Sequence, residues 1–103
     1  MKRFCVLTAL CALATTLPAW SQTTSTQTPI RVVIVGLVHG HVKGFLNALP
    51  KHPEAQLVGI VEPDKTLAQE YAEHYHLTPA LFTTDLESTL TKQHPDAVLV
   101  YTT

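Results

Sequence analysis

Residues 30–103 alternate short apolar runs with segments of helical periodicity, and this alternation is what most constrains the fold. The runs are rich in β-branched residues and span Val32 to Val35, Leu57 to Val61 and Ala97 to Tyr101. Strands that are apolar almost throughout are typical of a parallel sheet covered on both faces. With a shorter strand near Ala80 to Thr83, the pattern predicts an α/β fold, a doubly wound parallel sheet in the order βαβαβαβ.

Three helices are predicted between these strands. Apolar residues at i, i+3, i+4 and i+7 form one face of the first, which Pro50 and Pro53 end. That face consists of Val42, Phe45, Leu46 and Leu49. Asp64 is expected to cap the second helix, which buries a stripe from Leu67 to Tyr75. The third is expected to begin at Thr84-Asp85-Leu86-Glu87, which has the spacing of a capping box.

Gly36 follows the first strand, where a strand-to-helix turn needs a residue without Cβ. Such a glycine lets the backbone turn tightly beside a pyrophosphate, although a plain structural turn uses glycine as well. The sequence departs from the dinucleotide-binding pattern G-x-G-x-x-G, because Val38 and His41 stand in place of the second and third glycines. The Val38 side chain is expected to crowd a diphosphate. Gly44 is expected to let the first helix approach the sheet.

His39-Gly40-His41 falls where the first helix should begin. Imidazole donors there could reinforce the helix dipole in holding a phosphate, so His39, Gly40 and His41 are candidate cofactor contacts. The alternative is that both histidines are ordinary surface or turn residues. Two histidines without a further ligand at diagnostic spacing do not predict a metal site.

Glu62 follows the second strand at about the distance from Gly36 at which a ribose-binding acid is expected. A carboxylate there accepts hydrogen bonds from ribose hydroxyls and repels a 2′-phosphate, which favours NAD over NADP. The alternative is a solvated acid in a Glu-Pro-Asp turn. Thr102, after the last strand, lies where open α/β sheets bind ligands.

Four segments resemble the amino-terminal half of the Gfo/Idh/MocA oxidoreductases. They are Arg31 to Leu37 (RVVIVGL), Val58 to Asp64 (VGIVEPD), Thr84 to Glu87 (TDLE) and Asp96 to Thr102 (DAVLVYT). The resemblance covers essentially all of residues 30–103. It implies a Rossmann-type domain that binds a dinucleotide, NAD or NADP, for hydride transfer on sugars and related alcohols.

No catalytic residue is predicted. The family's Lys-Pro motif has no counterpart here, because Lys51-His52-Pro53 falls in a helix-ending turn. The resemblance therefore predicts a partial relative that lacks the substrate domain, so a sugar or polyol substrate requires a second domain. Two alternatives remain open: a non-enzymatic exported module that binds nucleotides or anions, and a non-functional gene fragment. The oligomeric state is not predicted.

Residues 1–21 have the pattern of a secretory signal peptide. A basic start at Lys2-Arg3 precedes an apolar run from Phe4 to Leu17, and small residues allow cleavage after Ser21. The run is shorter than the roughly 20 residues of a membrane span. Residues 22–29 are predicted to form a flexible polar spacer before the domain. We expect a periplasmic or secreted protein with no membrane association after cleavage.

Cleavage at this point would change the composition of the chain. Both cysteines, Cys5 and Cys11, would be removed, which excludes disulfides and thiol catalysis. Removal of Lys2 and Arg3 would leave five of the seven basic residues against eight acidic ones. A mildly acidic chain without a basic cluster predicts no nucleic-acid partner.

Overall fold

Four parallel strands form one sheet in the order β3-β2-β1-β4, which confirms the predicted α/β fold. The computed structural model describes Pro18 and residues 27–103. The rest of the predicted signal peptide and residues 22–26 of the predicted spacer lie outside the described part. The elements are β1 (Ile30–Val35), α1 (His41–Ala48), η1 (Leu49–Lys51), β2 (Ala55–Val61), α2 (Lys65–His74), η2 (Pro79–Leu81), β3 (Phe82–Thr83), α3 (Leu86–Gln93) and β4 (Ala97–Val100).

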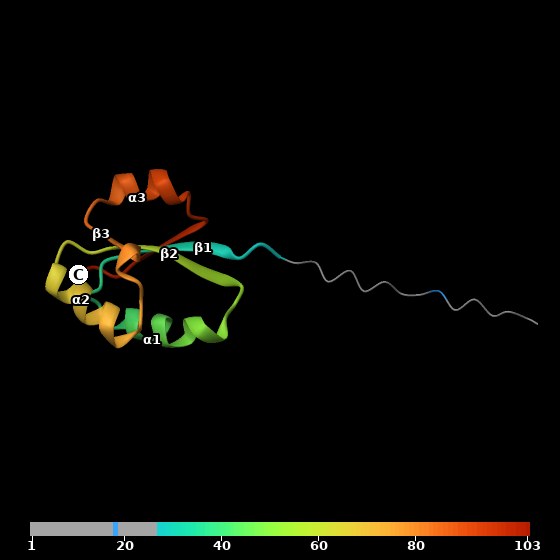
Figure 1. Cartoon of the computed structure of the whole chain (residues 1–103), viewed down its shortest axis with the longest axis horizontal. Helices are drawn as coiled ribbons and strands as arrows, with labels where there is room; N and C mark the ends of the chain where they lie inside the picture. The colour runs from blue at the N-terminus through green and yellow to red at the C-terminus, as the bar shows by residue number, and fades with distance from the viewer. Residues whose placement is uncertain (1–17, 19–26) are drawn as a thin grey trace, which may run out of the picture.

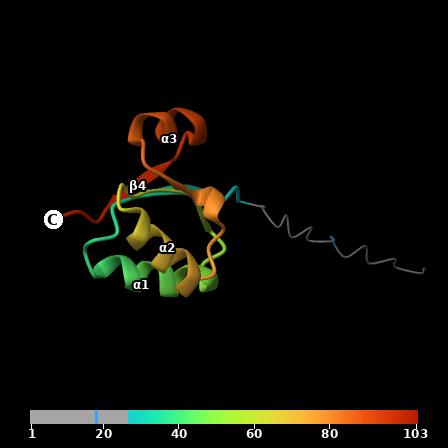
Figure 2. The same ribbon diagram turned by 60° about the vertical axis from the view of Figure 1, so that its left-hand side comes forward.

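Helices cover both faces of the sheet. Helices α1 and α2 lie on one face and α3 lies on the other, so the domain has three layers (Figure 1). The view turned by 60° shows both α1 and α2 beneath the strands, with α3 above them (Figure 2). Among the described residues, none of the helices has the length and apolar character needed to cross a bilayer.

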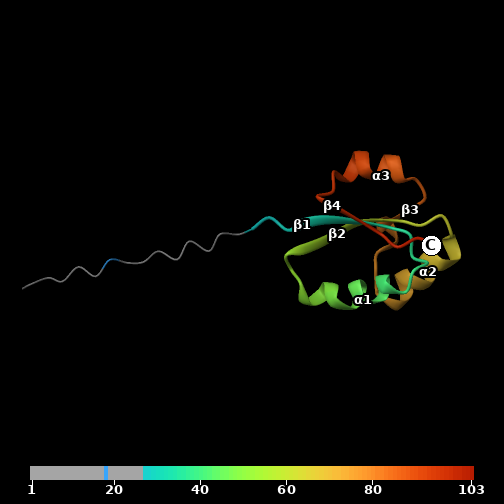
Figure 3. The same ribbon diagram turned by 180° about the vertical axis from the view of Figure 1, so that it is seen from behind.

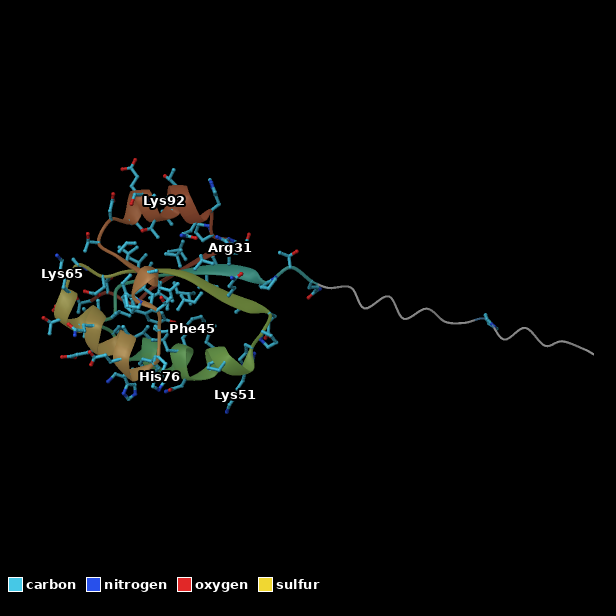
Figure 4. The ribbon with its side chains drawn as sticks, in the orientation of Figure 1. Arg31, Phe45, Lys51, Lys65, His76 and Lys92 are labelled. Atoms are coloured by element: carbon cyan, nitrogen blue, oxygen red, sulfur yellow. The ribbon has the colours of Figure 1, made fainter. Side chains whose placement is uncertain are left out.

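The main core lies between the sheet and helices α1 and α2. Its buried members are Ile34, Leu37, Val42, Leu46, Ile60 and Tyr71. The predicted apolar face of the first helix is confirmed for three of its residues: Val42 and Leu46 are buried, and Phe45 is half-buried between α1 and the sheet (Figure 4). The fourth, Leu49, lies beyond the end of α1, in η1. Gly44 is exposed, and a Cβ built there meets nothing within 4 Å. The prediction that Gly44 brings the helix close to the sheet is therefore wrong.

Close approach of a helix to the sheet occurs on the opposite face, at Gly59. A Cβ there would lie 3.0 Å from Thr89 Cγ2 of α3. The Thr89 hydroxyl is buried, donates to the Asp85 carbonyl oxygen at 2.6 Å and lies 2.6 Å from Thr83 Oγ1. Glycine in the middle of β2 is explained by this contact, since a side chain would push α3 outward.

Aspartates begin the second and third helices. Asp64 Oδ1 accepts hydrogen bonds from the N–H groups of Thr66 and Leu67, at 3.0 and 3.1 Å, so the predicted cap is confirmed. The cap of α3 is Asp85, whose Oδ1 accepts from the Glu87 N–H at 3.1 Å. The sequence predicted a capping box with Thr84 as the cap, which is wrong by one residue. The cap is Asp85, because its own carboxylate accepts an N–H of the first turn.

Strand β4 departs from the predicted coverage on both faces. Val98 and Val100 are 42% and 63% exposed. The reason is that α3 packs over β2, while β4 is the edge of the described sheet. Arg31 fixes α3 to β1 instead: its guanidinium donates to the Gln93 carbonyl oxygen at the end of α3 at 2.7 Å (Figure 4).

Candidate functional site

The carboxyl ends of β1, β2 and β4 lie at the same edge of the sheet. The chain runs outward from β1 to β2 and β3, then returns to the other side of β1 to form β4. Ligands of open parallel sheets bind where the strand order reverses in this way. Gly36, Glu62 and Thr102 each follow one of these strands, and the end of the chain leaves the sheet on this side (Figure 3).

Gly36 has a φ of +85°, a backbone conformation that residues other than glycine rarely adopt. Its N–H donates to the Val61 carbonyl oxygen at 2.8 Å. A Cβ built there would lie 2.8 Å from Thr102 Cγ2 and 3.1 Å from the Tyr101 carbonyl oxygen. The requirement for glycine therefore arises within the chain, from the backbone angle and from the end of β4.

Two further hydrogen bonds hold the turn after Gly36. The Leu37 N–H donates to Glu62 Oε2 at 2.8 Å, and the His39 N–H donates to the Tyr101 carbonyl oxygen at 3.0 Å. The first bond joins the turn to the end of β2, and the second joins it to the end of β4. The turn is thus fixed from both neighbouring strands.

Glu62 is only 4% exposed, so the alternative of a solvated turn acid is wrong. Besides the bond from Leu37, its Oε1 accepts the Asp64 N–H at 3.1 Å. One backbone N–H group thus bonds to each oxygen of this buried carboxylate. Each carboxylate oxygen still has a second lone pair with which to accept a ligand hydroxyl.

Glu62 lines a small cavity between the β2–α2 and β3–α3 connections. The cavity has a volume of about 190 Å³ and is lined by Glu62, Lys65, Ala68, Phe82, Thr83 and Thr84. Lys65 was not singled out by the sequence analysis, although its place directly after the Asp64 cap was a usable signal. Lys65 brings a cation to the cavity in which Glu62 places an anion.

The segment from Val38 to His41 is exposed. Val38 is 59% exposed, and a Cβ built on Gly40 meets nothing within 4 Å. The two imidazole rings lie together, with centroids 4.5 Å apart, and His39 Nδ1 accepts the His41 N–H at 3.3 Å. Both rings therefore lie together at the exposed start of α1.

The start of α1 offers free backbone donors. The N–H groups of Val42 and Lys43 bond back to the carbonyl oxygens of His39 and Gly40. Within residues 27–103, by contrast, no acceptor serves the N–H groups of Val38 and Gly40. Exposed N–H groups at a helix amino terminus, with open space over a glycine, are suited to a phosphate.

Two other kinds of site receive no support. Across residues 27–103 no three His, Cys, Asp or Glu side chains gather where they could hold a metal ion. A larger cavity of about 430 Å³ lies away from the switch point, against α2 and β3, and its lining includes Ala68, Ala72, Leu77 and Phe82. It is mostly apolar, and its two polar side chains, Gln69 and Glu73, bond to each other at 3.1 Å.

A glycine turn with positive φ, a helix amino terminus and an acid after the second strand define a dinucleotide-binding domain. Residues 30–103 match the model of the GFO_IDH_MocA oxidoreductase family, described as an NAD-binding Rossmann fold. The chain belongs to this family, and residues 30–103 are its NAD-binding Rossmann domain. The predicted resemblance is confirmed.

A solved structure has the same fold. It is the WlbA dehydrogenase from Chromobacterium violaceum in complex with NADH and UDP-GlcNAcA, with a TM-score of 0.61 and 24% sequence identity. The similarity covers 75% of this chain and 21% of that one, so the chain spans about a fifth of the length of that dehydrogenase. No curated protein sequence matches the chain.

Proposed function

We propose that residues 30–103 bind NAD in preference to NADP, as the cofactor half of an exported oxidoreductase acting on sugars or related alcohols. One observation carries the proposal: the free N–H groups at the start of α1 and the buried Glu62 share the edge of the sheet where the strand order reverses. An anionic diphosphate and a ribose diol are the chemical groups that such an arrangement suits.

The diphosphate is assigned to the start of α1. The N–H groups of Val38 and Gly40 donate to it, with the imidazoles of His39 and His41 beside them. Gly40 leaves room for a phosphate because nothing lies within 4 Å of its missing Cβ. The exposed Val38 side chain stands where the dinucleotide-binding pattern has its second glycine, and it weakens the binding. Thr102 offers a hydroxyl at the end of β4.

The preference for NAD is assigned to Glu62. Its carboxylate lines the small cavity after β2, where it accepts ribose hydroxyls and repels a 2′-phosphate. Lys65 lines the same cavity and attracts that phosphate, so the preference is a balance of two charges. Replacing Glu62 by Ala reduces the discrimination, and replacing Lys65 by Ala increases it.

The bound cofactor would supply hydride transfer, and this chain would bind and orient it. Hydride transfer also needs a substrate held about 3 to 3.5 Å from the nicotinamide, and a group that removes the hydroxyl proton. The described residues offer no acid–base set at the switch point beyond the exposed histidine pair assigned to phosphate. We therefore expect no turnover from the chain alone with sugars or polyols and NAD, measured as formation of NADH.

Calorimetric titration of the chain with NAD, NADP and pyrophosphate tests the binding proposal. Saturable binding that is tightest for NAD is expected. Equal or tighter binding of NADP would refute the role of Glu62. Pyrophosphate binding as tight as NAD binding would favour an anion-binding module, and a disordered circular-dichroism spectrum would favour a non-functional fragment.

Export is a second proposal with its own test. The basic start, the apolar run and the small residues before Gln22 support cleavage after Ser21. Amino-terminal sequencing of material from the periplasm or medium is expected to begin at Gln22. Uncleaved protein retained in the cytosol would refute it.

A further inference from the structure

Glu62 joins two separate loops of the nucleotide site. Its Oε2 accepts the N–H of Leu37, in the glycine turn, and its Oε1 accepts the N–H of Asp64, at the start of α2. We propose that Glu62 is a positioning residue for the diphosphate, acting through the glycine turn as well as on the ribose. The proposal rests on the nucleotide site of the proposed function and adds a second role for its acid.

The hydrogen bond from the Leu37 N–H to Glu62, called the tether below, lies between two buried residues. Leu37 is 1% exposed and Glu62 is 4% exposed. A buried N–H that loses its acceptor destabilises that conformation, so the turn would rearrange to satisfy it. The acceptor here is a side chain from another strand, 25 residues away along the chain.

The tether determines where the free donors point. The Leu37 N–H is held by Glu62 and the His39 N–H by the Tyr101 carbonyl oxygen. These bonds fix the peptide groups on both sides of Val38, and the Val38 N–H between them has no acceptor within residues 27–103. Releasing Leu37 frees this stretch to rotate, so a phosphate would have to order it again.

Glu62→Gln tests this role because it keeps the shape of the side chain and removes one of its two acceptor oxygens. Both oxygens of Glu62 accept backbone N–H groups, whereas an amide has one oxygen and one NH₂ donor. Glutamine has nearly the same shape but can serve only one of the two loops. Loss of a negative charge would by itself strengthen phosphate binding, so a weaker affinity cannot be attributed to the charge.

The ligand test removes the ribose hydroxyls. Calorimetry compares ADP with 2′,3′-dideoxyadenosine 5′-diphosphate, on the wild-type chain and on Glu62→Gln. We expect the variant to bind the dideoxy ligand at least fivefold more weakly than the wild type does. If Glu62 acts only on the ribose, its replacement leaves the affinity for the dideoxy ligand unchanged or raises it, and the proposal is overturned. Glu70→Gln, the same change at an exposed position of α2, is the matched control and is expected to leave both affinities unchanged.

A second measurement needs no ligand. Amide hydrogen exchange is followed by NMR in the unliganded wild-type chain and in Glu62→Gln. The Leu37 and Asp64 amides both donate to Glu62, so at least one of them is expected to exchange markedly faster in the variant, while the Gly36 amide, which donates to a carbonyl oxygen, keeps its rate. Unchanged exchange of both amides would overturn the proposal. Failure of the wild type to bind ADP would refute the proposed function and would leave this measurement of the tether intact.

Discussion

The two halves of the loop between β1 and α1 differ in what holds them. Gly36 and Leu37 are buried, and their N–H groups bond to the end of β2. Val38, Gly40 and His41 are exposed, and a side chain added at Gly40 would meet only open space. The chain itself explains the residues of the inner half. We assigned those of the outer half to the proposed phosphate contact, so substitutions in the two halves are expected to affect different properties.

Gly36→Ala is expected to have the largest effect. An L residue at positive φ costs about 1 to 2 kcal/mol, and the added methyl overpacks the end of β4 by about 1 to 3 kcal/mol. We expect the free energy of unfolding in urea to fall by about 2 to 4 kcal/mol on these grounds.

Gly44→Ala is the matched control for that substitution. It adds the same methyl group to an exposed position inside α1, where nothing lies within 4 Å. Alanine is favoured over glycine in a helix, so this variant is expected to be more stable than the wild type by up to about 1 kcal/mol. Equal effects of the two substitutions would contradict the contrast between a constrained turn and an open surface.

A double-mutant cycle sharpens the account of Gly36. The nearest atom to its missing Cβ is Thr102 Cγ2, at 2.8 Å, and Thr102→Ser removes that carbon. Gly36→Ala should therefore be less damaging in the Thr102→Ser background than in the wild-type chain, by about 1 kcal/mol. The Tyr101 carbonyl oxygen and the positive φ remain, so the rescue is partial. Additive effects would mean that the Thr102 side chain moves aside at no cost. The positive φ and the Tyr101 carbonyl oxygen would then account for the whole loss of stability.

The sequence predicted most of the inner half of the loop. Alternating apolar runs and helical faces indicated the parallel sheet, and Gly36 and Glu62 were found from their positions after β1 and β2. What could not be predicted was the direction of each contact. Glu62 was expected to face only a ribose, and its bonds to Leu37 and Asp64 join residues that periodicity does not relate.

The close contact between helix and sheet shows the same limit. A glycine inside a predicted helix, Gly44, and a glycine inside a predicted strand, Gly59, look equally suited to it in the sequence. Only the packing of α3 over β2, where Thr89 meets Gly59, distinguishes them. Spacing along one chain segment indicates which face is apolar, but it does not indicate which neighbouring element will lie against that face.

The histidine pair tests the outer half. In the variant His39→Ala/His41→Ala, the free energy of unfolding should change by less than about 0.5 kcal/mol, because both side chains are exposed. The affinity for ADP is expected to fall about two- to fivefold, which corresponds to the loss of a hydrogen bond from an imidazole N–H to phosphate, worth roughly 0.5–1 kcal/mol. His52→Ala, at an exposed site after η1 where the ring contacts Glu54 Oε1 at 2.7 Å, is the control for binding and should leave the affinity for ADP unchanged. An unaltered affinity in the double variant would make the pair ordinary surface histidines.

Val38→Gly is expected to have the smallest effect, and its direction is what matters. Val38 stands where the dinucleotide-binding pattern has a second glycine, and its side chain is 59% exposed beside the free donors of the loop. Removing that side chain should bring a diphosphate closer to the Val38 and Gly40 N–H groups. The added flexibility of glycine costs about 0.4 to 1 kcal/mol and offsets part of this gain. The net expectation is an affinity for NAD about two- to threefold higher by calorimetry, with slightly lower stability. Weaker binding would mean that Val38 orders the loop more than it obstructs the phosphate, and the outer half would then be constrained by its own side chain, as the inner half is by Glu62.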